Sequence, residues 1–359
     1  MKIEKNFSLK NFNTYKINCV CKYFCTIETV NQLKQVIQCK EFKECKKHLV
    51  LGGGSNLLLI PKKYNGIVIY LKIKKRKIIK QTNTKVYIEF GAGENWNNAV
   101  KYCTKNNFGG IENLAYIPGT VGGAAVQNIA AYDQNLEDCF YKLTAVNYKT
   151  LETKTFSKKE CNFEYRSSIF KSDLNKWVVT HVILVLNKNN KLDTKYFETG
   201  LNKTNVQQEL EQIAKPPYTI FDMYKAIVSL RKKRIPEDKK FPNCGSFFKN
   251  PVVTKHKYLK IKKDIPNLQF YPTGKVKYVS NKKIKEGKVK ISCGQLFDLG
   301  LNLRGRAFGN VTINEKNAAF IVNNGKATGA EIKKFSEYLK QQVYDKYKIK
   351  LEEEVRIIQ

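Results

Sequence analysis

Apolar side chains that recur every three or four residues predict four amphipathic helices in this chain. Such spacing places the apolar positions on one face of a helix, which can then be buried. Gly109 and Gly110 end the second helix, and Pro236 stops the third. The apolar positions that define the four helices are Leu33, Val36 and Ile37; Trp96, Ala99, Val100 and Cys103; Met223, Ala226, Ile227 and Leu230; and Ile332, Phe335, Leu339 and Val343.

Short runs of β-branched and aromatic residues lie between these helices and predict strands. Strands and helices that alternate in this way indicate an α+β fold with mixed sheets. A chain of 359 residues is long for one core and suggests two or three domains. The polar stretch 187–217 begins without a helical pattern and favours a boundary there. The strands are predicted at 48–51, 57–60, 66–71, 86–90, 142–148, 177–186, 309–311 and 318–322.

The chain is strongly basic, with 65 Lys and Arg against 31 Asp and Glu and a formal net charge of +34 at pH 7. An excess of this size is typical of proteins that bind nucleic acid. The basic residues are, however, spread over predicted helices, loops and strand ends, as at 74–77 and 232–234, with no long basic tail. We therefore expect a solvated basic surface that attracts anions in general, and no nucleic-acid partner.

The 10 cysteines are expected to be free thiols in the reducing cytoplasm, because the charged first residues contain no apolar leader. Apolar runs stay well short of the ~18–20 residues that a membrane span needs, so we expect no membrane partner. Cys19, Cys21 and Cys25 lack the second pair or nearby histidine that would complete a metal site. Cys19 and Cys21 share one face of a strand, which favours small buried side chains and no metal.

Three glycine-rich stretches lie at 51–56, 91–96 and 117–125. Successive small residues allow backbone N–H groups to converge on an anion such as a pyrophosphate. None of the three completes G-x-G-x-x-G or G-x-x-x-x-G-K-[ST], so neither a Rossmann site nor a P-loop is indicated. For each stretch taken alone, an ordinary tight turn is the better explanation.

Residues 243–251 read N-C-G-S-F-F-K-N-P and place the hydroxyl of Ser246 at a fixed position. Gly245 lets another group approach the backbone, two phenylalanines anchor the segment, and Lys249 supplies a nearby cation. This combination suits a hydroxyl that donates a proton. A Gly-Ser turn between two strands is the structural alternative.

The nine-residue string resembles the N-[AC]-G-S-F-F-K-N-P segment of the UDP-N-acetylenolpyruvoylglucosamine reductase (MurB) family. Other segments resemble the same family in the same order. The three glycine-rich stretches contain G-G-G-S-N, G-A-G-E-N-W and I-P-G-T-V-G-G-A-x₃-N, and 13–15, 164–170 and 351–356 are similar to its N-T-[FY], [GE]-Y-R-x-S-x-F and L-E-x-E-V-R segments. The resemblance runs from about Ser8 to Gln359.

The resemblance implies an FAD-binding region with two subdomains, of the vanillyl-alcohol-oxidase/PCMH type, followed by a smaller α/β substrate-binding domain. It places the FAD-binding region at 1–189, split near 62–85, a connecting or lid segment at 190–219, and the substrate-binding domain at 220–359. The cofactor is then FAD held without a covalent bond, because Ser55 stands where related oxidases carry a tethering His or Cys. NADPH is the co-substrate, and the substrate is a small-molecule UDP-sugar, UDP-N-acetylglucosamine enolpyruvate. A monomer is expected.

The resemblance also carries roles to individual residues. Arg166 and Glu354 are expected at the enolpyruvyl carboxylate, and Ser246 is expected to protonate C2. Arg234 stands where the family commonly has Lys, and Tyr196 is the candidate for a lid-loop tyrosine. The residues expected to contact FAD are Gly52, Gly53, Gly54, Ser55, Asn56, Pro118, Gly119, Gly122, Gly123, Ala124 and Asn128, and those expected to contact the UDP-sugar are Tyr132, Tyr196, Arg234, Lys249, Asn250 and Asn317.

Two functions of other classes compete with this interpretation. An FAD oxidase of the same fold would require a tethering residue and would not need the Ser246 segment. A nucleic-acid-binding protein would require a focused basic stripe. A remnant that had lost activity would be expected to lack Ser246, Arg166 or Glu354, and all three are present.

Overall fold

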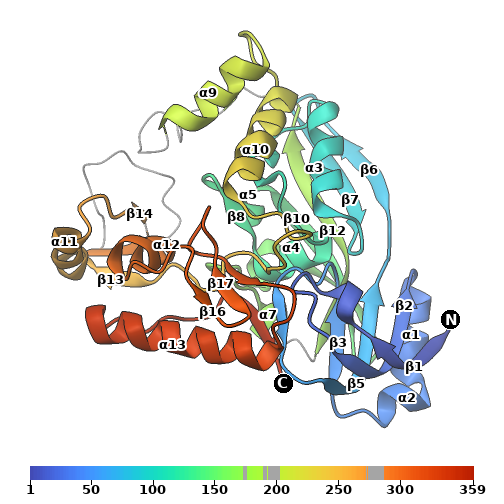
Figure 1. Cartoon of the computed structure of the whole chain (residues 1–359). Coiled ribbons are helices and arrows are strands. Elements are labelled where there is room, and N and C mark those ends of the chain that lie inside the picture. The colour runs from blue at the N-terminus through green and yellow to red at the C-terminus, as the bar shows by residue number, and fades with distance from the viewer. Residues whose placement is uncertain (173–175, 189–191, 193–202, 272, 274–286) are drawn as a thin grey trace.

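The computed structural model describes residues 1–172, 176–188, 192, 203–271, 273 and 287–359. Three regions follow one another along the chain, coloured blue, cyan to yellow, and orange to red in Figure 1. Each region contains at least one sheet with helices packed against it, so the predicted α+β fold is confirmed.

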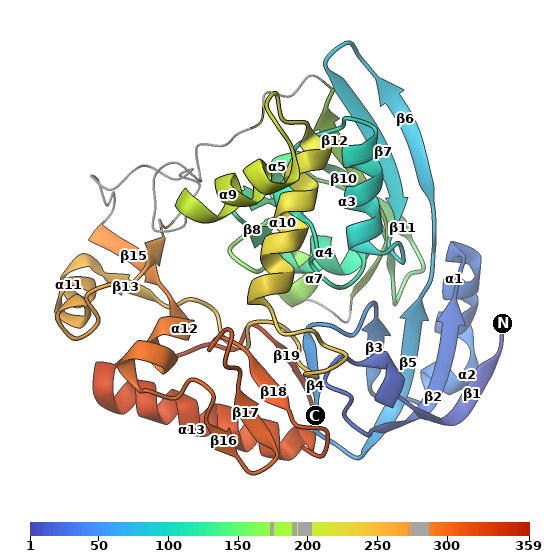
Figure 2. The same cartoon turned by 45° about the horizontal axis from the view of Figure 1, so that its top comes forward.

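The first region is a four-stranded sheet in the order β1-β2-β5-β3, with α1 and α2 on one face (Figure 2). β1 and β2 are antiparallel, whereas β5 runs parallel to both β2 and β3. Leu33, Val36 and Ile37 of α1 are buried against this sheet, as their spacing predicts. The elements are β1 (Ile3–Ser8), η1 (Lys10–Phe12), β2 (Val20–Ile27), α1 (Val30–Gln38), α2 (Lys40–Lys43), β3 (His48–Leu51), β4 (Leu57–Leu59) and β5 (Lys63–Leu71).

The middle region is a five-stranded antiparallel sheet in the order β11-β10-β12-β7-β6. α4 packs on this sheet, α3 packs against α4, and α10 packs against α3, so that Trp96, Phe90 and Met223 are buried in one core. The elements are β6 (Arg76–Gln81), β7 (Lys85–Gly91), α3 (Trp96–Lys105), η2 (Glu112–Leu114), α4 (Val121–Gln127), β8 (Ala130–Ala131), β9 (Gln134–Asn135), α5 (Leu136–Cys139), β10 (Phe140–Asn147), β11 (Thr153–Ser157), α6 (Lys158–Cys161), α7 (Ile169–Ser172), β12 (Trp177–Asn187), α9 (Lys203–Ile213) and α10 (Ile220–Arg234).

The third region carries two small antiparallel sheets, β13-β15-β14 and β16-β17-β18, beside the long helix α13. Thr328 caps α13 and forms a capping box with Glu331, a strong signal for a helix start. The elements are β13 (Val252–Thr254), α11 (Lys255–Asp264), β14 (Phe270–Tyr271), β15 (Lys288–Ile291), α12 (Cys293–Gln295), η4 (Leu296–Gly300), β16 (Ala307–Phe308), β17 (Val311–Ile313), β18 (Ile321–Asn323), α13 (Gly329–Tyr347) and β19 (Arg356–Ile358).

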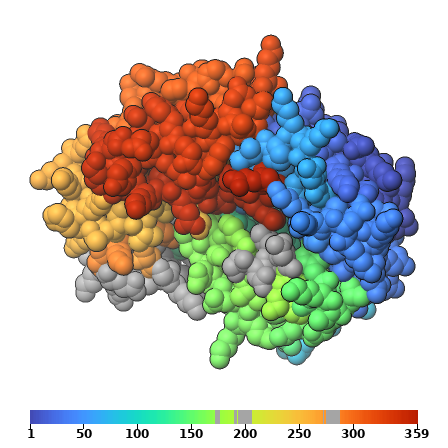
Figure 3. Space-filling view, turned by 90° about the horizontal axis from the view of Figure 1, so that it is seen from below, coloured from blue at the N-terminus to red at the C-terminus, as the bar shows by residue number. Residues whose placement is uncertain are grey.

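The first and third regions share one hydrophobic core, although they are far apart in sequence. Leu58 and Phe24 pack in the same cluster as Phe247, Leu339 and Val355. β19 runs parallel to β4, with Arg356 opposite Leu57. In Figure 3 the dark red C-terminal residues accordingly lie between the blue first region and the green part of the middle region. The chain therefore closes on itself around the centre of the molecule.

All four predicted helices are confirmed, while several smaller elements differ from the expectation. The strands predicted at 309–311 and 318–322 lie slightly further on, at β17 and β18. α4 forms where only a glycine-rich turn was expected, and α9 and α11 were not predicted. α10, expected at the start of the substrate-binding domain, buries Met223, Ile227 and Leu230 in the core of the middle region.

The cysteine cluster packs as small apolar side chains. Cys19, Cys21 and Cys25 are fully buried, and burial raises the pKa of Cys19 to about 11 and that of Cys25 to about 12. Within the residues that the structure describes, no group of three His, Cys, Asp or Glu side chains could hold a metal ion. None of the described helices is both long and apolar enough to cross a membrane.

Candidate active site

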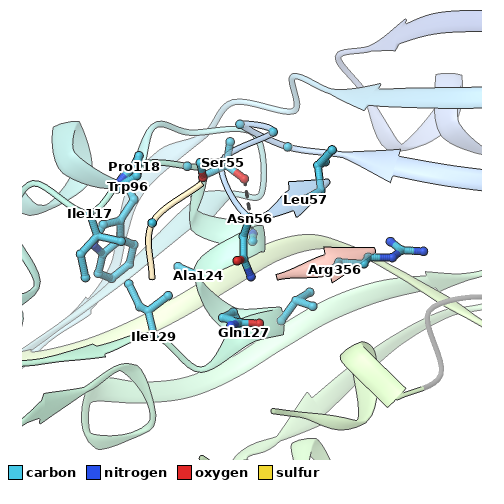
Figure 4. A pocket seen from close by; sticks show the side chains of 18 of the residues that line it. Ser55, Asn56, Leu57, Trp96, Ile117, Pro118, Ala124, Gln127, Ile129 and Arg356 are labelled. Carbon is cyan, nitrogen blue, oxygen red and sulfur yellow. Dashed lines mark hydrogen bonds between the residues drawn. The ribbon is translucent and has the colours of Figure 1, made fainter. Parts of the chain in front are cut away.

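A cavity of about 510 Å³ lies where the three regions meet. This volume falls in the range typical of sites for small molecules and cofactors. Its walls come from the loop between β3 and β4, from α4 and the loop before it, from the end of α10, and from the segments around Ser246 and Glu354. In Figure 4 the apolar side chains of Trp96, Ile117 and Ile129 lie on one side, and Gln127 lies beside the strand of Arg356.

Two glycine loops form one wall of the cavity, with backbone packed directly on backbone. A Cβ added to Gly53 would lie 2.7 Å from the Cα of Gly119, and one added to Gly52 would lie 2.6 Å from the Thr120 hydroxyl oxygen. Gly54 has φ of +63°, and a Cβ there would lie 2.0 Å from the carbonyl oxygen of Phe12. The glycines therefore serve close packing as well as access to the backbone.

α4 continues this wall and begins with a capped turn. Thr120 is the N-cap, and its hydroxyl accepts a bond from the Gly123 N–H at 3.3 Å. A Cβ on Gly122 would lie 2.7 Å from the Ala92 side chain, so the helix start packs tightly on the middle sheet. The loop and α4 thus present Pro118, Gly119, Gly122, Gly123 and Ala124 to the cavity together with Gly52, Gly53, Gly54, Ser55 and Asn56.

Asn128 ends α4 in the left-handed conformation with φ of 45°. Its amide nitrogen donates to the Glu164 carbonyl oxygen at 3.0 Å, and its amide oxygen accepts from the Glu137 N–H at 3.2 Å. The side chain is 3% exposed and is not part of the cavity wall. Asn128 therefore holds the end of α4 and the start of the Arg166 turn in place.

Arg166 stands at the tip of a tight turn in which Glu164 and Ser167 exchange backbone bonds of 3.0 and 3.1 Å. Its φ of 57° lies in the left-handed region, which costs a side-chain-bearing residue about 1–2 kcal/mol. The turn directs the guanidinium into the cavity, where Nε donates to Glu354 Oε1 at 2.8 Å and Nη2 donates to the Ala130 carbonyl at 3.1 Å. Strain of this kind concentrates at functional positions.

Nη1 of Arg166 is buried and has no hydrogen-bond partner among the described residues. Burial alone would lower the pKa of Arg166, but the Glu354 carboxylate raises it, so the net pKa lies above its ordinary value. A buried charged donor without a partner is costly unless a ligand satisfies it. Arg166 thus brings a buried charged donor to the wall of the cavity.

Glu354 lies on the C-terminal segment just before β19. Its N–H donates to the Phe247 carbonyl at 2.9 Å, which fixes it beside the Ser246 segment. Oε1 of Glu354 accepts from both Arg166 Nε and Gln127 Nε2, the latter at 3.3 Å. Glu354 therefore has one oxygen engaged by two donors.

Ser246 lies on an extended segment between two partners. Gly245 precedes it with φ of 84°, and its N–H donates to Asn243 Oδ1 at 2.9 Å. Ser246 bridges to Phe320 on one side, while Phe248 bridges to Glu353 on the other. The Ser246 side chain lines the cavity, and among the described residues its hydroxyl has no hydrogen-bond partner. Ser246, Arg166 and Glu354 are thus brought to one cavity from three distant segments.

The remaining expected substrate contacts divide into two groups. Tyr132, Arg234 and Asn317 line the cavity. Lys249 and Asn250 do not: Lys249 Nζ lies 2.5 Å from Glu352 Oε1, and Asn250 Oδ1 accepts from the Cys293 N–H at 3.0 Å. Ser246 and Lys249 are three residues apart on an extended segment. Because successive side chains of such a segment point to opposite faces, the side chain of Lys249 points away from that of Ser246. Tyr196 lies outside the described residues.

The polar side chains of the wall that the sequence reasoning missed include Gln127, Lys171 and Arg231. Arg231 precedes Arg234 by three residues on α10, a spacing that places both on one helix face. Burial lowers the pKa of Arg231, whose Nε donates to the Tyr116 carbonyl at 3.4 Å. Helical spacing was the signal available for Arg231, whereas nothing in the sequence pattern singled out Gln127 or Lys171.

Comparison with known proteins shows which class of protein has this fold and cavity. Residues 21–151 match the family model of an FAD binding domain, and residues 236–358 match the model of the UDP-N-acetylenolpyruvoylglucosamine reductase C-terminal domain. The fold and the cavity therefore define a flavin-dependent oxidoreductase. Its fold is the expected two-subdomain FAD-binding region of the vanillyl-alcohol-oxidase/PCMH type with a separate C-terminal domain.

Relatives of full length identify the family. The chain is 38% identical to the UDP-N-acetylenolpyruvoylglucosamine reductase of Flavobacterium johnsoniae and 32% identical to that of Amoebophilus asiaticus, with 100% of both chains covered in each case. The crystal structure of the reductase (MurB) from Thermus caldophilus superposes with a TM-score of 0.67 at 20% identity and 100% coverage of both chains. The chain belongs to the UDP-N-acetylenolpyruvoylglucosamine reductase family.

The chain is therefore an FAD-dependent enzyme that reduces UDP-N-acetylglucosamine enolpyruvate to UDP-N-acetylmuramate with NADPH, in the synthesis of peptidoglycan precursors. The residues present fit the cofactor, because two glycine loops converge on one side of a cavity with apolar walls, and a Cβ on Gly52, Gly53 or Gly54 would collide with neighbouring atoms. The first loop carries Ser55 and no cysteine or histidine, which agrees with a non-covalent flavin.

Proposed function

We propose that Arg166, Glu354 and Ser246 carry out the chemistry of this reduction. The observation that supports the proposal is the buried, unpartnered Nη1 of Arg166, which lies in the same cavity as Glu354 and Ser246. The enolpyruvyl group carries a carboxylate, and a guanidinium N–H is a strong donor to such a group. Arg166 Nη1 would thus bind the carboxylate next to the reacting double bond.

The reaction adds a hydride to C3 of the enol ether and a proton to C2. The two glycine loops would hold FAD, and the bound cofactor would supply the hydride chemistry that links NADPH to C3. Addition at C3 moves the electron pair of the double bond toward C2 and the carboxylate, and Arg166 stabilises this charge because its guanidinium is already in position. Glu354 holds the guanidinium through Nε and so keeps Arg166 in position for the substrate carboxylate.

Ser246 gives its proton to C2 and completes the product. A serine hydroxyl is a weak acid, so it must be close to the carbon and correctly oriented. Its hydroxyl is engaged by none of the described residues and is therefore available to the substrate. The cations of Arg166, Arg231 and Lys171 in the same cavity favour the negative charge that the oxygen acquires.

The two ligands would contact different parts of the cavity: FAD the glycine wall, and the UDP-sugar the polar residues that include Arg234 of α10. The residues Gly52–Asn56 and Pro118–Ala124 would contact FAD, and Tyr132, Arg234 and Asn317 would contact the UDP-sugar. Lys249, Asn250 and Tyr196 would complete the proposed set of substrate contacts. NADPH and the UDP-sugar would then occupy one site in turn. The protein would be a cytoplasmic monomer. Its FAD-binding region would span 1–189 and its substrate-binding domain 220–359, and the segment 190–219 would connect them.

The purified protein tests this proposal directly. It should be yellow, and acid precipitation should release FAD into the supernatant, because no covalent bond holds it. Anaerobic NADPH should bleach the visible absorbance, and UDP-N-acetylglucosamine enolpyruvate should restore it with one equivalent of UDP-N-acetylmuramate formed. A flavoprotein that NADPH bleaches but this substrate does not reoxidise would contradict the proposed chemistry.

A further inference from the structure

Lys171 connects the backbones of two residues that we assign to the chemistry. Its Nζ donates to the carbonyl oxygen of Arg166 at 3.0 Å and lies 3.4 Å from the carbonyl oxygen of Glu354. Lys171 belongs to the one-turn helix α7 and lines the cavity. One ammonium group thus joins the left-handed corner at Arg166 to the C-terminal segment.

The surroundings of Lys171 are charged on several sides. Arg166 and Lys249 oppose its positive charge, while Glu354 and Glu352 favour it. Within the described residues no carboxylate lies in ion-pair distance of its Nζ, so the ammonium group is bound through main-chain oxygens. A lysine used only to anchor a helix would need neither the cavity position nor two such carbonyl partners.

We propose that Lys171 is a positioning residue for the reduction: it holds the Arg166 corner and the Glu354 segment so that both side chains meet the same substrate carboxylate. The inference rests on the roles proposed above for Arg166 and Glu354. The carbonyl of Arg166 belongs to the strained residue itself, so its bond to Lys171 opposes relaxation of the corner. The ammonium group also adds positive charge where the substrate carboxylate gains negative charge.

Titration provides a readout that a purely structural lysine would not give. Burial, followed by the nearby charge of Lys249, lowers the pKa of Lys171 to about 8. Below that pH the ammonium form is present, and as the pH rises through about 8 the charge is lost. The second-order rate constant for reoxidation by the substrate should therefore fall above about pH 8, since this constant reports groups of the free enzyme.

Three variants of the flavin-loaded protein test the assignment. Lys171→Met removes the donor and should slow reoxidation by the substrate about 10–100-fold, the loss usual for an outer hydrogen-bond partner of a reacting group. Lys171→Arg keeps a charge that does not titrate, so its reoxidation should lose the fall near pH 8. Lys158→Met is the matched control, because Lys158 also donates to a backbone carbonyl, that of Glu137, but lies outside the cavity wall.

The two half-reactions separate the outcomes. All three variants should be bleached by NADPH at the wild-type rate and should retain their FAD, and the Lys158 variant should also reoxidise normally. Equal slowing of both half-reactions in Lys171→Met, or reoxidation at the wild-type rate, would overturn the assignment, as would an unchanged alkaline fall in Lys171→Arg. A wild-type protein that the substrate fails to reoxidise would instead overturn the proposed function.

Discussion

The two sides of the cavity differ in which groups form them: main-chain atoms form one side, and polar side chains form the other. The glycine wall consists of main chain packed on main chain, and its shape depends on the absence of side chains at Gly52, Gly53 and Gly54. The polar side consists of side chains from distant segments, held by the bond between Arg166 and Glu354, and Gln127 at the end of α4 joins it to the glycine wall. Added side-chain volume in the glycine wall should therefore reduce stability and flavin binding. On the polar side, the loss of a single hydrogen-bond donor should reduce the rate of the reaction.

Replacement of Ser246 should produce the largest change and should affect one half-reaction alone. Ser246→Ala should slow reoxidation by the substrate by roughly 10²–10⁴-fold, the range for a lost general acid. Bleaching by NADPH should remain near the wild-type rate, because the hydroxyl bonds to none of the described residues and its loss leaves the fold intact. Stopped-flow absorbance of the two half-reactions measures both rates.

Ser246→Cys is the companion variant, and it should retain more activity than Ser246→Ala because a thiol can still donate a proton. If the alanine variant reoxidises as fast as the wild type, then Ser246 only shapes the turn. The polar side of the cavity would in that case need another acid.

Arg166→Ala should rank next, with reoxidation slowed roughly 10²–10³-fold, the usual effect of removing one preorganised donor. Arg166→Lys should recover little, because a lysine cannot reproduce the forked contacts to Glu354 and Ala130 while leaving a further donor for the substrate. NADPH should still bleach both variants normally. Slowing of that step by the same factor would show that Arg166 acts on the flavin's surroundings instead.

Gly54→Ala probes the glycine wall and should reduce stability and flavin content together. The added Cβ would collide with the Phe12 carbonyl, and the alanine would have to adopt the left-handed φ of +63°. Together these two effects should lower the free energy of unfolding by about 2–5 kcal/mol. Gly309→Ala is the matched control, since Gly309 has φ of +61° and no atom within 4 Å of the added Cβ. Thermal unfolding and FAD released per chain give the comparison, and equal losses in the two variants would contradict the steric account.

Asn128→Ala should have the smallest effect and should reduce stability by about 1–2 kcal/mol through its lost bonds. FAD content should be nearly unchanged, because the side chain bonds to Glu164 and Glu137 and lies outside the cavity wall. Asn162→Ala is the control for the left-handed backbone, since Asn162 ends α6 with φ of 42°. A large loss of FAD in Asn128→Ala alone would assign Asn128 to the cofactor after all.

The same contrast explains what the sequence could predict. Local patterns predicted four of the helices and eight of the strands, because one face of each is buried in a core. The ordered motifs indicated the family, the cofactor and the residues of the glycine wall. The contacts of Lys171 and Gln127 could not be predicted, because each depends on a partner far away in the chain, such as Glu354. The pairing of Lys249 with Glu352 was missed for the same reason, as was that of Glu353 with Lys333 and Lys340.

The pairing of β4 with β19 has a consequence for how the protein is made. Leu57 meets Arg356 only after about 300 further residues have been synthesised, so β4 leaves the ribosome long before its partner exists. Contacts of such sequence separation slow folding, and they leave strand edges exposed in the meantime. The core shared by the first and last regions can close only after the C-terminal segment has been made, and Glu354 reaches the cavity in the same step. Catalytic competence is thus a late event of biogenesis, and an interrupted chain would carry the glycine loops without Glu354.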